Sequence, residues 1–124
     1  MSKPVALDIN DMPWGDWPEG WPGNDGLVRW KRLVKGGGMF SGIMEFQPGG
    51  VWIAHHHAEA EIYYFTSGSG IIEVAGETFE ARPGLAVFIP GNATHRTENT
   101  GTEPLCLFYV FPTEVIEDIQ YIFD

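Results

Sequence analysis

The chain has 124 residues, 44% of them hydrophobic and 14% aromatic, which suits one compact domain with a buried core and excludes a disordered chain. Seventeen acidic residues against seven basic ones give a net charge of −10, which argues against binding to nucleic acid or to an anionic membrane. The start MSKPVALDIN lacks the apolar core of a signal peptide, and no apolar run is long enough to span a bilayer. With a single cysteine, Cys106, and therefore no internal disulfide, we expect a cytoplasmic protein without a membrane segment.

Residues 1–25 are predicted to form an irregular arm. Trp14, Trp17 and Trp21 lie among proline and glycine residues in the stretch DMPWGDWPEGWPGND, which does not allow a regular helix. An arm of this kind can cover the mouth of a domain, where its tryptophans line a pocket, or it can pack against the outside or a second subunit. The sequence leaves both alternatives open.

Residues 26–124 are predicted to form one all-β domain, because short segments rich in β-branched and aromatic residues alternate with Gly, Pro and Asn. The expected strands are 27–34, 37–46, 51–57, 60–66, 70–76, 77–84, 86–91 and 105–111. Turn residues predict hairpins at 47–50, 67–70 and 75–77. Only the tail, 113–123, has a weak helical pattern, with Thr113 as a candidate cap. This pattern is typical of an antiparallel sandwich or barrel.

Four of the seven basic residues lie close together in the segment RWKRLVK: Arg29, Lys31, Arg32 and Lys35. They could form an anion site, or they could be charges that protect the edge strand of a sheet from pairing with another chain. The second interpretation is favoured.

The segment IAHHHAEAE contains the candidate metal ligands. If 51–57 is a strand, His55 and His57 point to one face and His56 to the other. Glu61 begins the next strand, and antiparallel pairing would bring its carboxylate back beside the two imidazoles. His95 follows a Pro-Gly-Asn turn and could add a third imidazole. Three imidazoles and one carboxylate suit a divalent transition metal ion (Fe, Mn, Ni, Zn or Cu) and leave positions open on a six-coordinate ion.

The spacing of these residues resembles the two sequence motifs of the cupin superfamily. The residues that match the first motif are Gly49, His55, His57, Glu61 and Gly68, and those that match the second are Gly84, Pro90, His95 and Asn99. The resemblance implies a single-domain double-stranded β-helix, a jelly-roll barrel, with His55, His57, Glu61 and His95 as the metal ligands. One position departs from the motif: the glycine expected two residues after Pro90 is Asn92. Since asparagine tolerates a left-handed backbone, we expect the turn to be kept.

A second resemblance is narrower. The stretches AEIYYFTSGSG, IPGNATH and FYVFPTE, together with Tyr121, are similar to the small single-domain cupin lyases that cleave dimethylsulfoniopropionate to dimethyl sulfide and acrylate. This resemblance implies a metal-dependent carbon–sulfur lyase with Tyr63 as the catalytic tyrosine and Tyr121 as a second active-site tyrosine. In such a β-elimination the metal holds the substrate carboxylate and a tyrosine removes the adjacent proton.

The sulfonium end of such a substrate is a cation without hydrogen-bond donors, which aromatic faces recognise best. Trp30 and Tyr64 are candidate substrate-binding residues for this reason. Trp52 is also aromatic, but strand alternation places it on the face opposite His55, which leaves outer packing and a role in the pocket as open alternatives.

Two other functions are compatible with the same ligand set. One is an Fe(II)-dependent dioxygenase of a small thiol or phenolic substrate, and the other is a non-catalytic protein that binds a metal or a metabolite. In each case the expected partner is a small molecule, and a homodimer is expected as in other cupins.

Overall fold

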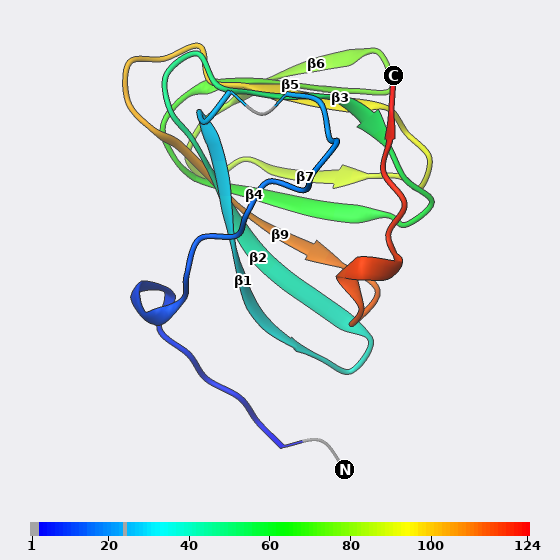
Figure 1. Cartoon of the computed structure of the whole chain (residues 1–124). Coiled ribbons are helices and arrows are strands. Elements are labelled where there is room, and N and C mark those ends of the chain that lie inside the picture. Colours follow the sequence, from blue (N-terminus) through cyan, green and yellow to red (C-terminus); the bar gives the residue numbers. More distant parts are fainter. Residues whose placement is uncertain (1–2, 24) are drawn as a thin grey trace.

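The computed structural model describes residues 3–23 and 25–124, and it has the predicted all-β jelly-roll architecture (Figure 1). Two antiparallel five-stranded sheets face each other. The strands of the first sheet are, in spatial order, β1 (Val28–Gly36), β2 (Met39–Phe46), β9 (Leu105–Phe111), β4 (Glu61–Ser67) and β7 (Ala86–Ile89). The strands of the second sheet are β10 (Ile122–Phe123), β3 (Val51–His56), β8 (His95–Glu98), β5 (Gly70–Val74) and β6 (Glu77–Ala81).

The core lies between the two sheets because inward and outward residues alternate along each strand. In β9, Leu105, Leu107, Tyr109 and Phe111 are buried, whereas the residues between them are half-buried on the outer face. Burying one such apolar side chain fully stabilises the fold by about 1.5–3 kcal/mol. The inward side chains of the two sheets therefore hold the domain together.

The turn residues predicted where strands end, but they did not always predict which strands pair. Residues 75–77 lie in the β5–β6 connection, which is the predicted hairpin. The segments 47–50 and 67–70 instead lead from the first sheet to the second, so the hairpins predicted there are wrong. Glycine with positive φ occurs both in the hairpin and in the connections between sheets: Gly76 and Gly68 each have φ 83°. A Cβ atom on Gly68 would also meet the Pro104 carbonyl. Which strands pair depends on the closure of the whole barrel.

The basic segment lies on β1, at the edge of the first sheet, as the favoured interpretation predicted. Arg29 pairs with Glu45 on β2 at 2.6 Å and lies over the Trp14 ring at 3.8 Å. Lys31 donates to the Ile9 carbonyl at 3.0 Å. These side chains fasten the N-terminal arm to the outside of β1.

Two asparagines tie the motif segments together. Asn92 has φ 64°, so it adopts the left-handed conformation expected of it, and its backbone N–H donates to the His57 carbonyl at 2.7 Å. The buried side chain of Asn99 donates to the carbonyls of Phe46 and Glu103 at 2.9 and 2.8 Å. These contacts hold the ends of the two motifs side by side.

The segments outside the barrel are irregular. The arm contains one short 3-10 turn, η1 (Ile9–Asp11). The tail forms no α-helix: it has one 3-10 turn, η2 (Ile116–Asp118), and then β10, which pairs with β3. In Figure 1 the tail, drawn in red, runs from the end of β9 to the second sheet and so bridges the two sheets. Over the described residues, no helix is long and apolar enough to cross a membrane.

Candidate metal centre

The three histidines predicted to bind a metal converge inside the barrel. His55 and His57 come from β3 and the residue just after it, and His95 begins β8. His55 is the register partner of His95, which brings the two ring centroids to 4.1 Å. All three rings are buried, and their ligand atoms lie within 4.8 Å of one another.

The predicted alternation of side chains along the strand fails at Trp52. It is buried, and its ring centroid lies 4.2 Å from that of His55, on the same side of the sheet. The register of β3 against β8 shifts between Trp52 and His55, so the strand has a bulge there. A bulge adds one residue to a strand and reverses the faces beyond it. The placement of Trp52 opposite His55 is therefore wrong.

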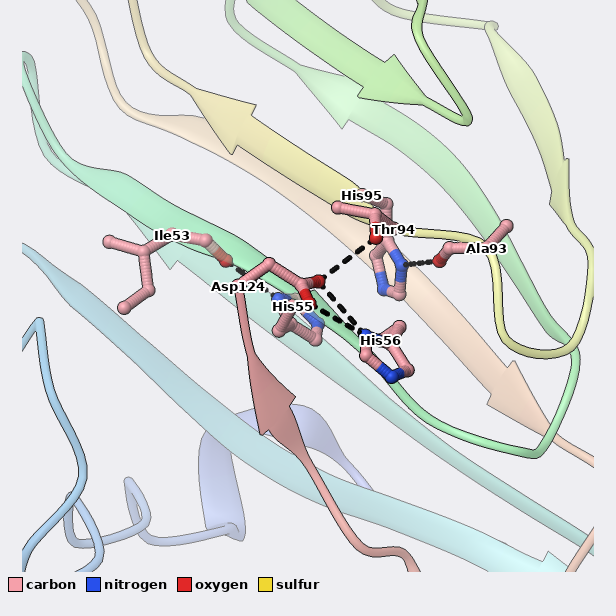
Figure 2. A network of polar contacts seen from close by, with 7 residues as sticks. All are labelled: Ile53, His55, His56, Ala93, Thr94, His95 and Asp124. Carbon is pink, nitrogen blue, oxygen red and sulfur yellow. Dashed lines mark hydrogen bonds and ion pairs between the residues drawn. The ribbon is translucent and has the colours of Figure 1, made fainter.

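Each histidine is oriented by a hydrogen bond to a backbone carbonyl two residues away in the chain. The Nδ1–H groups of His55, His57 and His95 donate to the carbonyls of Ile53, Glu59 and Ala93 at 2.7, 2.9 and 2.9 Å. Figure 2 shows two of these bonds, from His55 and His95. Since a carbonyl can only accept, the proton must sit on Nδ1, and the lone pair of Nε2 is free.

Glu61 faces these Nε2 atoms from the other sheet. Its Oε1 atom lies 3.3 Å from His57 Nε2 and 3.5 Å from His95 Nε2. The sequence predicted that antiparallel pairing of neighbouring strands would bring Glu61 to the histidines. This is wrong, because β3 and β4 belong to different sheets. Glu61 instead points inward from β4 and meets the histidines across the barrel.

The four residues fit a transition metal ion. The Nε2 atoms of His55, His57 and His95 and Oε1 of Glu61 are buried and have no hydrogen-bond partner within residues 3–23 and 25–124. Buried polar atoms without partners are costly, and a cation that accepts four lone pairs would satisfy all of them. Imidazole nitrogens with one carboxylate suit the divalent transition metals.

Burial and the charge of Glu61 shift the pKa values of two of the histidines. Burial lowers the pKa of His55 to about 3, so its imidazole is neutral at ordinary pH. Burial also lowers the pKa of His57, but the negative charge of Glu61, whose Oε1 lies 3.3 Å from Nε2, outweighs this and raises the pKa above 6.5. A bound cation would replace the proton that Glu61 favours on His57.

An aromatic cavity of about 320 Å³ opens beside the histidine cluster. Seven aromatic side chains line it: Trp17, Trp21, Trp30, Trp52, Tyr109, Phe111 and Tyr121. Glu61 lines it too, and so connects the cavity with the cluster. The other charged groups in its wall, Arg32 and Glu117, pair with each other at 2.8 Å.

The two tyrosines implied by the resemblance both lie next to the cluster. Tyr63 is fully buried, with its ring centroid 6.1 Å from that of His95, and it is not among the residues that line the cavity. Tyr121 lines the cavity, with its ring centroid 5.3 Å from that of His57 and 5.6 Å from that of His55. Burial raises the pKa of both phenols well above 10.

The two predicted substrate-binding residues lie in different places. Trp30 lines the cavity. Tyr64 is 45% exposed and lies in a different hollow with Trp14 and Cys106, on the outer face of the first sheet. The structure therefore does not bring Tyr64 to the cluster.

Both alternatives left open for the arm occur, since Trp17 and Trp21 line the cavity and Trp14 packs outside on Arg29. Sequence reasoning missed Tyr109, although counting inward positions along β9 would have found it. Arg32 and Glu117 were missed as cavity residues as well. Their pairing across 85 positions has no local signal.

His56 points away from the cluster, as predicted. Its Nδ1–H donates to both carboxylate oxygens of Asp124 at 2.9 Å, and the Thr94 hydroxyl donates to the same carboxylate at 2.9 Å (Figure 2). The middle histidine of the run thus contacts the tail instead of the metal ligands.

Comparison with known proteins identifies relatives with similar sequences. A family model described as a cupin domain matches residues 42–111. The dimethylsulfoniopropionate lyase DddW of Ruegeria pomeroyi is 37% identical over 125 aligned residues, which cover 97% of this chain and 80% of the relative.

Solved structures share the fold at lower identity. A cupin-2 domain from Rhodospirillum rubrum superposes with a TM-score of 0.77 at 19% identity, covering 94% of this chain and 78% of that one. A structure from a study of the dimethylsulfoniopropionate lyases RdDddP and RnDddQII superposes with a TM-score of 0.67 at 20% identity, covering 78% and 52% of the two chains. These two matches support the fold alone.

Proposed function

Because this chain belongs to the cupin family, we propose that it is a metal-dependent carbon–sulfur lyase that cleaves dimethylsulfoniopropionate to dimethyl sulfide and acrylate. The observation that carries the proposal is a histidine–glutamate cluster at one side of an aromatic cavity. The likeness to a lyase with this substrate over almost the whole chain supports it.

His55, His57, Glu61 and His95 would hold the ion. A bound transition metal would supply a positive charge that binds the substrate carboxylate, acidifies the neighbouring C–H group and opposes the effect of burial on the tyrosine pKa. The side chains contribute by being oriented in advance: backbone hydrogen bonds fix the three imidazoles, and the three Nε2 atoms and Glu61 Oε1 are buried without hydrogen-bond partners among the described residues.

The cavity walls suit the other end of this substrate. A sulfonium group is a cation that cannot donate hydrogen bonds, and each aromatic face that it contacts contributes about 0.5–2 kcal/mol. Trp17, Trp21 and Trp30 provide such faces around the cavity. The one cationic side chain among the residues that line it, Arg32, is paired with Glu117, so it does not repel the sulfonium.

The reaction needs one proton acceptor. We assign it to the Tyr63 oxygen, two residues beyond Glu61 on the same strand, and assign Tyr121 to contact with the substrate in the cavity wall. The C–H bond next to the carboxylate breaks, and its electron pair forms the double bond of acrylate. The C–S bond breaks and its electron pair leaves with dimethyl sulfide. The proton passes to the oxygen of Tyr63 in its phenolate form, which becomes a neutral phenol, and the phenol then returns the proton to water.

The decisive experiment adds dimethylsulfoniopropionate to metal-loaded protein and measures dimethyl sulfide in the headspace by gas chromatography. We expect product from the wild type and a loss of about 100-fold or more in kcat for Tyr63→Phe, the size typical of a lost acid–base group. Metal content, measured by elemental analysis, should stay unchanged in this variant.

Tyr64→Phe is the matched control, because it removes the neighbouring hydroxyl outside the cavity and should keep full activity. Absence of dimethyl sulfide from metal-replete wild type would reject the proposal. Oxygen uptake that depends on a thiol or phenolic substrate would identify a dioxygenase instead, and heat of binding without turnover would identify a metabolite-binding protein.

A further inference from the structure

We propose that His56, Thr94 and Asp124 form a latch that fixes the tail and thereby positions Tyr121 in the cavity. The latch is defined by the contacts of these three side chains. Its catalytic consequence rests on the proposed function, but its effect on the position of Tyr121 does not. The latch residues would be positioning residues, since none of them lines the cavity.

The latch joins three segments that are far apart in the sequence. Asp124 accepts hydrogen bonds from His56 on β3 and from Thr94, just before β8, all at 2.9 Å. Figure 2 shows this carboxylate above the outer face of the second sheet, between the two donors. The backbone N–H of Asp124 also donates to the Ala54 carbonyl at 3.1 Å. The end of the tail is therefore tied to two neighbouring strands.

Little else holds this end of the tail by polar contacts. Strand β10 has only two residues, Ile122 and Phe123, paired with His56 and His55. A pairing this short is marginal without further support. The other ion pair of the tail, Arg32 with Glu117, is more than half exposed on both sides, and such pairs contribute little. The latch is thus the polar side-chain anchor beyond Tyr121, next to the ring of Phe123, which packs against Trp21 and Trp52 with centroids 5.4 and 5.9 Å apart.

Tyr121 lies between two fixed points of the tail. Upstream, Ile119 is buried in the core, and downstream, β10 and the latch attach the chain to β3. Between them the Tyr121 ring packs against Trp21, with centroids 4.8 Å apart, and next to His57. If the downstream anchor is released, only the burial of Ile119 and the packing of the ring itself hold Tyr121 in place.

The barrel itself does not need the latch. His56 is only partly buried and Asp124 is exposed, so removing these contacts opens no cavity in the core. The ladder between β3 and β8 and the orientation of the three metal ligands rest on other bonds. Breaking the latch should therefore loosen the tail and leave fold and metal binding intact.

The test uses the full-length, metal-loaded protein with fluorine-labelled tyrosine. The chain has four tyrosines, and Tyr121→Phe identifies the fluorine NMR signal of Tyr121. In wild type this signal should be dispersed, and in Asp124→Ala or His56→Phe it should move toward the position of a solvent-exposed tyrosine. His56→Asn, whose amide keeps a donor near the place of Nδ1, should restore the wild-type signal.

Kinetics test the consequence for turnover. We expect Asp124→Ala to lower kcat about tenfold, the effect of a lost hydrogen bond to a charged group, with metal content unchanged. In a Tyr121→Phe background the same substitution should have little further effect, because coupled residues are not additive. Glu98→Gln, which removes the negative charge from the Arg96–Glu98 contact on the same outer face, should change neither the signal nor kcat.

An unchanged Tyr121 signal in both Asp124→Ala and His56→Phe would overturn the latch. So would a loss of activity in Asp124→Ala that is equally large with and without the Tyr121 hydroxyl. If the wild type produces no dimethyl sulfide, the proposed function fails, and the NMR signal alone then decides whether the latch exists.

Discussion

Single residues decide how the side chains of the candidate metal centre are oriented. Asn92 holds a left-handed turn where the motif has glycine, and its backbone bond to His57 places the end of one motif against the turn of the other. The three Nδ1–H groups each use a backbone carbonyl two residues away, so the chain itself selects the tautomer that leaves Nε2 free. Local hydrogen bonds thus prepare the site before an ion arrives.

Asp124 gives a prediction for pH at the residue scale. The hydrogen bond from His56, with that from Thr94, favours the ionised carboxylate and lowers its pKa below 3.8. The unfolded chain therefore binds this proton at higher pH than the folded chain does. The stabilisation is present above pH 3.8 and is lost as the pH falls through the lower, folded-state pKa.

The measurement is a titration of the Asp124 carboxyl carbon by NMR in wild type and His56→Phe. We expect a pKa below 3.8 in wild type and a rise toward that ordinary value in the variant. Equal pKa values in the two proteins would show that the His56 contact is absent in solution.

At the scale of elements, the N-terminal arm and the tail complete the cavity that the barrel alone would leave open. Trp17 and Trp21 come from the arm, and Ile119 and Tyr121 come from the tail. Trp21 contacts Tyr121 with ring centroids 4.8 Å apart, so the two segments meet over the site. In the part of the chain that the structure describes, neither segment contains a long strand or helix, and both are held to the barrel by packing and by hydrogen bonds.

The arm should determine affinity for the cationic end of the substrate. We expect Trp21→Ala to raise KM for dimethylsulfoniopropionate by about 2- to 30-fold, corresponding to one lost cation–aromatic contact. Trp14→Ala is the matched control, because Trp14 belongs to the same arm but packs on Arg29 outside the cavity. Steady-state kinetics with both variants measures the difference.

A neutral thioether analogue separates charge from shape. If the aromatic faces recognise the sulfonium, binding of 3-(methylthio)propanoate should depend less on Trp21 than binding of dimethylsulfoniopropionate does. An equal loss for both compounds would mean that Trp21 contributes only shape.

At the scale of the whole molecule, the histidine–glutamate cluster joins the two sheets. His55, His57 and His95 come from the second sheet side, and Glu61 comes from the first. An ion bound by all four would act as a cross-link through the middle of the barrel. Metal binding and folding should therefore be linked.

Thermal unfolding with added zinc or manganese tests this linkage. At an ion concentration of about 100 times Kd the folded state gains about 2.7 kcal/mol, and Tm should rise by about 10 °C for a domain of this size. His57→Phe should lose most of this rise, whereas His56→Phe should keep it, although both variants remove one imidazole from the same run. Equal shifts in the two variants would place the ion elsewhere.

The homodimer expected from the sequence stays a prediction, since the structure contains one chain. Light scattering of the metal-loaded protein measures it directly.

The sequence by itself predicted the all-β fold and the candidate ligand set. The spacing of the two motifs singled out His55, His57, Glu61 and His95, and the structure brings these four side chains together. The left-handed turn at Asn92 was also predictable, since it depends on one residue type.

Only the tertiary structure decided what surrounds the ligands. The bulge that turns Trp52 inward depends on how β3 pairs with β8. Glu61 meets the histidines from the opposite sheet, and the turn residues alone do not show whether a turn forms a hairpin or leads from one sheet to the other. The tertiary structure also places Tyr64 outside the cavity. Trp17 and Trp21 line the cavity, and the latch holds Asp124, through contacts between segments that are distant in the sequence. Such contacts form when the barrel closes, and no local pattern specifies them.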